Sequence, residues 1–124
     1  METRDERPPV WVGHIALKAP DVNATRDFMV QLGMRPVADG EGYAVLELRG
    51  GTHLVVLAAD EPQTGVADFD LMVDDLEATH ARLRGLGLEP SEIGGGEIHS
   101  SFSVASPSGH RIVFNSTHVS SRPV

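Results

Sequence analysis

The sequence has no cysteine and few aromatic residues, and both shortages exclude particular chemistry. Without cysteine, the chain cannot form disulfides, offer a thiolate nucleophile or build a thiolate zinc site. Aromatic residues make up 5% of the chain, which has one Trp and one Tyr. A planar ligand would therefore find few rings on which to stack.

Basic residues and long apolar runs are also scarce. The chain has 10 Lys and Arg against 18 Asp and Glu, a formal net charge of -8, and no basic stripe that would contact nucleic acid phosphates. No stretch approaches the length of a membrane span, and the charged, proline-rich start is unlike a signal peptide. We therefore expect a soluble, cytoplasmic protein that binds neither nucleic acid nor membranes, although a cationic small ligand would suit its charge.

The chain contains an internal repeat, in which residues 14–36 align with residues 68–90 at a constant offset of 54. Seven of the 23 aligned positions are identical, where ordinary composition would give roughly one or two. The identical pairs are Leu17/Leu71, Asp21/Asp75, Ala24/Ala78, Thr25/Thr79, Leu32/Leu86, Gly33/Gly87 and Pro36/Pro90. Two copies of a unit that is too small to bury its own apolar face are expected to pack together around a shared cleft.

Each copy begins with an alternating stretch and continues with a helical period. In the first copy, Asp21 can cap a helix that ends at Gly33. In the second copy, Asp74 or Asp75 caps the helix and Gly87 ends it. The same local order in both copies predicts that each is one strand followed by one helix.

Three further strand-like stretches follow each helix. They lie at about 34–38, 43–48 and 53–58, and at about 88–93, 101–105 and 110–115. A chain of 124 residues is long enough for one sizeable core. We therefore predict a single α+β domain of two βαβββ modules, about 10–59 and 66–116, which form a curved mixed sheet around a cleft.

Alternation along the strands assigns side chains to two faces. The face toward the helices is uniformly apolar, and the opposite face is mixed and strongly polar. This second face is either the solvated side of an open sheet or the lining of a ligand cavity. The residues expected to line such a cavity are His14, Tyr43, Glu47, His53, Val55, Asp68, Asp70, Ser101, Ser103, Arg111, Val113 and Asn115, together with His99 if the glycine-rich stretch before it is a mobile lid.

Several motifs occur in order, with the two copies at the right separation. They are Gly13-His14-Ile15-Ala16-Leu17 with Asp21-Val22, Leu32-Gly33-Met34, Leu71-Met72-Val73-Asp74-Asp75-Leu76 and Ser106-Pro107-Ser108-Gly109-His110-Arg111-Ile112. In these motifs, over about residues 10–116, the chain resembles the vicinal oxygen chelate superfamily of glyoxalases, extradiol dioxygenases and bleomycin resistance proteins. The resemblance implies the fold but not one chemistry, because the same scaffold hosts isomerases, oxygenases and metal-free binders.

The resemblance also implies metal ligands, mostly His and Glu, at the start of the first strand and on the last strand of each copy. His14 matches the first position, Asp68 stands where many members have His, and Val55 and Val113 stand at the two Glu positions. Neither valine can bind a metal, so His53, which shares a face with Val55, is the nearest substitute. His14, His53 and Asp68 have the composition of a two-His, one-carboxylate site for one divalent ion, although His53 is displaced by roughly 7 Å along its strand.

Two functions from different classes stay open. One is a small-molecule-binding protein that holds its ligand in the cleft without a metal, as bleomycin resistance proteins do, which implies a role in antibiotic resistance. The alternative is a divalent-metal-dependent lyase or isomerase, or an extradiol-type dioxygenase, in which His14, His53 and Asp68 hold the ion that chelates the substrate. The resemblance further implies a homodimer whose clefts involve both subunits, and an open sheet edge favours such pairing.

Two polar residues are given less specific roles. His80 lies in the middle of the second predicted helix among charged residues, so we expect it to face solvent. Glu47 is expected either to contribute to the cleft or to form a salt bridge with Lys18 or Arg111.

Overall fold

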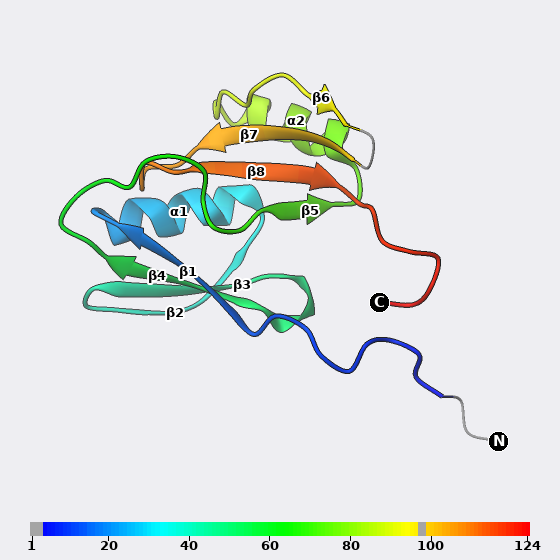
Figure 1. Cartoon of the computed structure of the whole chain (residues 1–124). Helices are drawn as coiled ribbons and strands as arrows, with labels where there is room; N and C mark the ends of the chain where they lie inside the picture. The colour runs from blue at the N-terminus through cyan, green and yellow to red at the C-terminus, as the bar shows by residue number, and fades with distance from the viewer. Residues whose placement is uncertain (1–3, 97–98) are drawn as a thin grey trace.

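The computed structural model describes residues 4–96 and 99–124, which fold into two βαβββ modules that follow one another along the chain (Figure 1). The first module consists of β1 (His14–Ala19), α1 (Val22–Leu32), β2 (Arg35–Gly40), β3 (Tyr43–Glu47), a short 3-10 helix (Arg49–Gly51) and β4 (His53–Ala58). The second consists of β5 (Leu71–Val73), α2 (Leu76–Gly85), β6 (Gly94–Gly95), β7 (Ser100–Ala105) and β8 (Arg111–Ser116).

Each module forms its own four-stranded mixed sheet. The first sheet has the order β1-β4-β3-β2 and the second the order β5-β8-β7-β6. In each sheet, the first strand of the module runs parallel to the last, and the other neighbouring strands are antiparallel. The predicted α+β fold of two βαβββ modules is confirmed. Among the described strands, β1 and β5 each have one side without a partner strand.

The two helices begin in the same way because the repeat carries the same N-cap. The Asp21 carboxylate accepts a hydrogen bond from the Ala24 N–H at 3.0 Å, and the Asp75 carboxylate accepts one from the Ala78 N–H at 2.9 Å. Such a bond satisfies one of the donors that a helix leaves unpaired at its start. At the other end, Gly33 adopts a left-handed conformation with φ of 120° and ends α1, as the sequence predicts.

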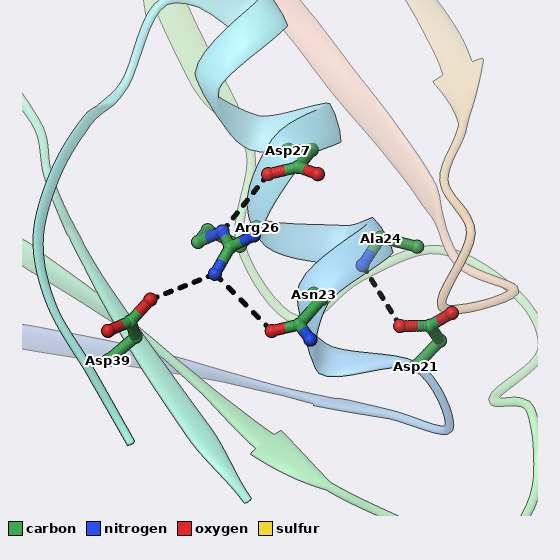
Figure 2. A network of polar contacts seen from close by, with 6 residues as sticks. All are labelled: Asp21, Asn23, Ala24, Arg26, Asp27 and Asp39. Atoms are coloured by element: carbon green, nitrogen blue, oxygen red, sulfur yellow. Dashed lines mark hydrogen bonds and ion pairs between the residues drawn. The ribbon is translucent and has the colours of Figure 1, made fainter. Parts of the chain in front are cut away.

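Arg26 fixes α1 against the edge strand of the first sheet. Figure 2 shows its guanidinium between Asp27 and Asn23 of the same helix and Asp39 of β2. The Nη1 atom lies 2.8 Å from Asp39 Oδ2 and 3.3 Å from Asn23 Oδ1, and Nε lies 3.0 Å from Asp27 Oδ1. One side chain thus joins the helix to β2, which α1 covers together with β3 and β4.

The buried side chains of both modules belong to one core. Its larger members are Leu17, Phe28, Met29, Leu32, Leu46, Leu54 and Val56 from the first module and Leu76, Leu83, Phe102, Val104, Ile112 and Phe114 from the second. Phe102 and Phe114 stack with their ring centroids 5.0 Å apart. The helix-facing sides of both sheets are therefore apolar and buried, as predicted, which leaves the polar sides for contacts with solvent or a ligand.

Arg82 and Arg49 connect the modules outside the core. Arg82 of α2 donates to the carbonyl oxygens of Gln31 and Leu32 at 2.8 and 3.0 Å, where the end of α1 leaves its carbonyls unpaired. Arg49 and Asp74 form an exposed ion pair at 2.7 Å. No helix in the described part of the chain is long and apolar enough to cross a membrane.

The prediction of a strand at residues 88–93 is wrong, because the paired residues are Gly94 and Gly95 instead. The stretch before them still lies beside β7: the Ser91 N–H donates to the Ser103 carbonyl at 2.8 Å, and the Ser91 hydroxyl accepts from the Ser103 N–H at 2.9 Å. A side-chain oxygen thus replaces one bond of a regular ladder. Pro90, directly before this contact, has no N–H and therefore cannot donate a backbone hydrogen bond to a neighbouring strand.

The prediction that His80 faces solvent is also wrong. His80 is 8% exposed, and its Nε2 atom lies 2.8 Å from the Ser91 carbonyl oxygen. Its ring packs edge-on against the Phe102 ring, with the two ring centroids 5.0 Å apart. His80 lies four residues after Leu76 and three before Leu83, so it shares their buried stripe.

Candidate functional site

The predicted site residues of the first sheet lie in one row across the strands, together with an arginine that the sequence analysis missed. We call this set, Arg35, Glu47, His53 and His14, the histidine row. Arg35 of β2 pairs with Glu47 of β3, Glu47 with His53 of β4, and His53 with His14 of β1. Residues that are directly opposite in neighbouring strands project to the same face, so the four side chains share the polar side of the sheet.

Polar contacts run along most of the histidine row. Glu47 forms an ion pair with Arg35, and its Oε2 lies 3.0 Å from His53 Nε2. The Arg35 guanidinium, and to a smaller extent His53, hold the pKa of the Glu47 carboxyl below its usual value. The rings of His53 and His14 meet edge to face with centroids 5.8 Å apart. The expected partners of Glu47, Lys18 and Arg111, are therefore replaced by Arg35.

A hollow on the second sheet collects six of the other predicted residues. We call it the Asn115 pocket. Its volume is about 280 Å³. It is lined by Asp68, Asp70, His99, Ser101, Val113 and Asn115, all predicted, and by Val66, Ala67 and Phe69, which were not predicted. Phe69 packs against the core and also borders the pocket.

Asn115 is the most enclosed polar residue of this pocket. It is 4% exposed and lies opposite Ser101 across the β7–β8 pair. Its side chain borders the pocket. The Nδ1 atom of His99, which also lines the pocket, is buried without a hydrogen-bond partner among residues 4–96 and 99–124, and a buried polar atom without a partner is unfavourable. Both groups are therefore able to bind a polar ligand.

Four predicted residues lie apart from these two groups of contacts. Val55 lies two residues beyond His53 on β4, opposite Val45, and Ser103 lies opposite Val113. Arg111 is exposed at the start of β8. The Tyr43 ring lies against Gly40, where a Cβ would overlap it.

The three predicted metal ligands do not meet within one chain. His14 and His53 lie in the histidine row, and Asp68 lies in the Asn115 pocket. Asp68 also borders a hollow with Ile15, but His14 projects to the opposite face of β1 from Ile15. Among the residues that the structure describes, no three His, Asp or Glu side chains are placed to hold a metal ion. The donor set of a single chain thus does not fit the ion that the fold family implies, and the metal stays a prediction.

The order of elements, the two mixed sheets and the polar faces define a protein of the glyoxalase type. Residues 11–114 match the family model described as the Glyoxalase/Bleomycin resistance protein/Dioxygenase superfamily. The chain therefore belongs to this superfamily, and the resemblance seen in its motifs is confirmed. No curated protein sequence matches the chain.

Solved structures with the same fold include both an enzyme and a binding protein. Lactoylglutathione lyase from Agrobacterium tumefaciens is 18% identical, with a TM-score of 0.74 over 90% of this chain and 97% of that one. TnmS3, an antibiotic binding protein from Streptomyces sp. CB03234, is 20% identical, with a TM-score of 0.70 over 90% and 98%. An integron cassette protein from the mobile metagenome of a Halifax Harbour sewage outfall is 19% identical, with a TM-score of 0.74 over 86% and 98%. At such identities the likeness shows the fold alone.

Proposed function

We propose that the protein binds a small organic molecule in the Asn115 pocket. The observation that carries the proposal is the meeting of six predicted cleft residues in one hollow, where Asn115 is 4% exposed and the His99 Nδ1 atom is buried without a partner in the described part of the chain. Ligand sites combine an apolar wall with a few convergent polar groups. Here Val113 and Ala67 supply the wall, and Asn115, Ser101 and His99 supply the polar groups. The antibiotic binding protein TnmS3 shows that this fold serves a binding function elsewhere.

The pocket alone is too small for a complete drug-sized ligand. Its volume of about 280 Å³ falls just below the range of roughly 300–1,000 Å³ that is usual for ligand pockets. Neither this pocket nor the three other large hollows described among residues 4–96 and 99–124 is lined by a residue of the histidine row. A ligand that extends beyond the pocket therefore needs a further wall.

A second copy of the chain is a suitable source of that wall. β1 and β5 each have an unpaired side in the described sheets, and unpaired strands bind other strands readily. Apolar side chains also lie exposed directly before β1, where Trp11 is 72% exposed between Val10 and Val12. A homodimer joined at these edges would cover the apolar segment and bring a histidine row from one copy toward an Asn115 pocket from the other.

The metal-dependent alternative has less support. It requires His14, His53 and Asp68 to converge, and within one chain they do not. Glu47 is already bound by Arg35 and His53. The binding function needs no such convergence.

Chemical-shift mapping would test the proposal. ¹⁵N-labelled protein is titrated with mixtures of small, soluble organic fragments. Amide shifts are expected to cluster at residues 68–70, at Ser101 and at residues 113–115, and to weaken in Asn115→Ala but not in Asn23→Ala, which changes an exposed asparagine on α1. Shifts confined to other surfaces, or shifts that are equal in both variants, would contradict the proposal.

A further inference from the structure

We infer that the group bound in the Asn115 pocket is an organic cation that carries N–H donors, such as a primary ammonium or an amidinium. This inference rests on the proposed function, since it names the class of ligand for the same pocket.

The first argument is the charge of the pocket wall. Asp68 and Asp70 lie two residues apart on the segment that leads into β5, and both border the pocket. Neither carboxylate takes part in an ion pair among residues 4–96 and 99–124. Two nearby carboxylates in a hollow concentrate negative potential, which attracts a cationic ligand.

Several other acidic side chains of the described residues form ion pairs with arginines. The carboxylates of Asp5, Asp27, Asp39, Glu47 and Asp74 each lie within ion-pair distance of an arginine. Arginines thus neutralise five of the acidic groups on the described surface, although the N-cap carboxylates of Asp21 and Asp75 also have no arginine partner among the described residues. The two pocket carboxylates lack this neutralisation among the described residues, and a ligand cation would supply it.

The second argument is the pair of polar side chains on the pocket wall. Asn115, which is 4% exposed, presents an amide oxygen that can accept a hydrogen bond, and the Nδ1 atom of His99 is buried without a partner among the described residues. An N–H of the ligand would satisfy this acceptor while a second N–H reaches Asp68 or Asp70. Hydrogen bonds between a charged donor and a carboxylate are stronger than bonds between neutral groups. A quaternary ammonium, which has no N–H, would satisfy neither acceptor.

The apolar part of the pocket limits the rest of the ligand. Ala67 is buried, Val113 and Phe69 are half-buried, and all three line the hollow. A short apolar body next to the cationic group therefore fits better than a polyol. Arg111 shares a face with Val113 on β8 but does not line the pocket, and it is the nearest cationic group along that strand face.

Two matched pairs of compounds test the inference. Benzylamine is compared with benzyl alcohol, and benzamidine with benzamide, by NMR titration of the full chain near neutral pH. Both cations are expected to bind at least about tenfold more tightly than their neutral counterparts, because hydrogen bonds to charged groups contribute more than neutral ones. Benzyltrimethylammonium, a cation without N–H donors, is expected to bind weakly, and shifts at Ser101 and Asn115 report that binding is in the pocket.

Variants then assign the effect to the carboxylates. Asp68→Asn and Asp70→Asn are expected to reduce benzamidine affinity by about tenfold each. Asp60→Asn, which removes an exposed carboxylate between β4 and β5 that does not line the pocket, is expected to leave the affinity unchanged. Equal binding of the cation and its neutral counterpart, or equal losses in Asp60→Asn and Asp68→Asn, would overturn the inference. Neutral fragments that bind in the pocket without any cation preference would overturn it but leave the proposed function standing, whereas failure of every fragment to shift the pocket amides would overturn both.

Discussion

Glu47 occupies the middle of the histidine row, between the Arg35 guanidinium and the His53 ring. Arg35 chiefly, and His53 next, lower the pKa of its carboxyl below the ordinary value of 4.5. A carboxyl whose pKa is lower in the folded state adds stability that is fully present above its unfolded pKa and is lost as the pH falls through its folded pKa. Glu47 therefore contributes to the loss of stability in acid.

We expect Glu47→Gln to be less stable than the wild type near neutral pH and to approach it in acid. The wild-type free energy of unfolding should decline more steeply below pH 4.5, with a slope difference of about one proton at most. Urea denaturation at a series of pH values measures both curves. Glu41→Gln, which changes an exposed carboxylate in the turn after β2, is the control. If the Glu47→Gln curve stays parallel to the wild type, Glu47 does not carry this linkage.

Gly109 and Gly87 provide a matched test of backbone conformation and space. Both have positive φ, 94° and 82°. A Cβ at Gly109 would overlap the Gln63 carbonyl, whereas a Cβ at Gly87 would meet no atom within 4 Å. Gly87→Ala is expected to cost about 1–3 kcal/mol through strain. Gly109→Ala should cost more, because it also pushes Gln63 away from Ser108, to whose carbonyl its N–H donates at 2.9 Å. Equal losses in denaturant unfolding would show that the overlap is relieved without cost.

At the scale of the elements, the repeated N-caps should make equal contributions. Asp21→Ala and Asp75→Ala each remove one cap bond of about 3 Å and are expected to lower the free energy of unfolding by about 1 kcal/mol. Asp21→Asn and Asp75→Asn keep an acceptor oxygen and should retain most of the stability. Chemical denaturation of the four variants tests this. A loss in the asparagine variants as large as in the alanine variants would mean that charge, and not the cap bond, stabilises the helices.

The elements that could be predicted are those with a local pattern of their own. Asp21 and Gly33 delimit α1 in the sequence and in the structure. The second strand of the later module lacked such a pattern, because its pairing depends on the Ser91 hydroxyl, which bonds to Ser103 on a strand twelve residues away. His80 was wrongly predicted to face solvent, because the prediction relied on its polar neighbours rather than on its spacing from Leu76 and Leu83 along the helix.

The position of Arg35 in the histidine row could not be predicted from the sequence because of a single β-bulge in β2. The hairpin pairs Gly40 with Tyr43, so regular counting would place Arg35 opposite Leu48, a residue that packs against the core. A shift in register between Pro36 and Ala38 places Arg35 opposite Glu47 instead. One extra residue in a strand moves the following side chains to the other face. The sequence pattern of this hairpin does not predict the bulge.

At the scale of the whole molecule, alternation predicted which face each side chain occupies but not how the two modules are related. Asp68, Ser101 and Asn115 do meet in one pocket, because Ser101 and Asn115 lie opposite each other on β7 and β8 and Asp68 lies on the segment that leads into β5 of the same sheet. His14 and Asp68 do not meet, because His14 lies on β1 of the first sheet and Asp68 precedes β5 of the second. The relation of one sheet to the other depends on core packing between distant residues, which no local pattern encodes.

The proposed homodimer can be tested at the open side of β1. The carbonyls of Gly13 and Ala19 accept from β4, at His53 and Ala59, each at 2.9 Å. Backbone groups alternate in direction along a strand, so the Ala16 N–H faces the open side. Proline is tolerated in an edge strand when its missing N–H faces outward. Ala16→Pro should therefore leave the fold intact while removing a donor needed for pairing between copies.

Light scattering coupled to size exclusion is expected to give twice the monomer mass for the wild type and the monomer mass for Ala16→Pro, with unchanged far-ultraviolet circular dichroism. Val119→Pro, in the exposed tail, should remain a dimer. If the second copy supplies a wall of the cleft, as proposed, fragment affinity should fall together with dimerisation in Ala16→Pro and should be unchanged in Val119→Pro. A monomeric wild type would refute the dimer, and a dimeric Ala16→Pro would show that the copies pair through a surface other than the β1 edge.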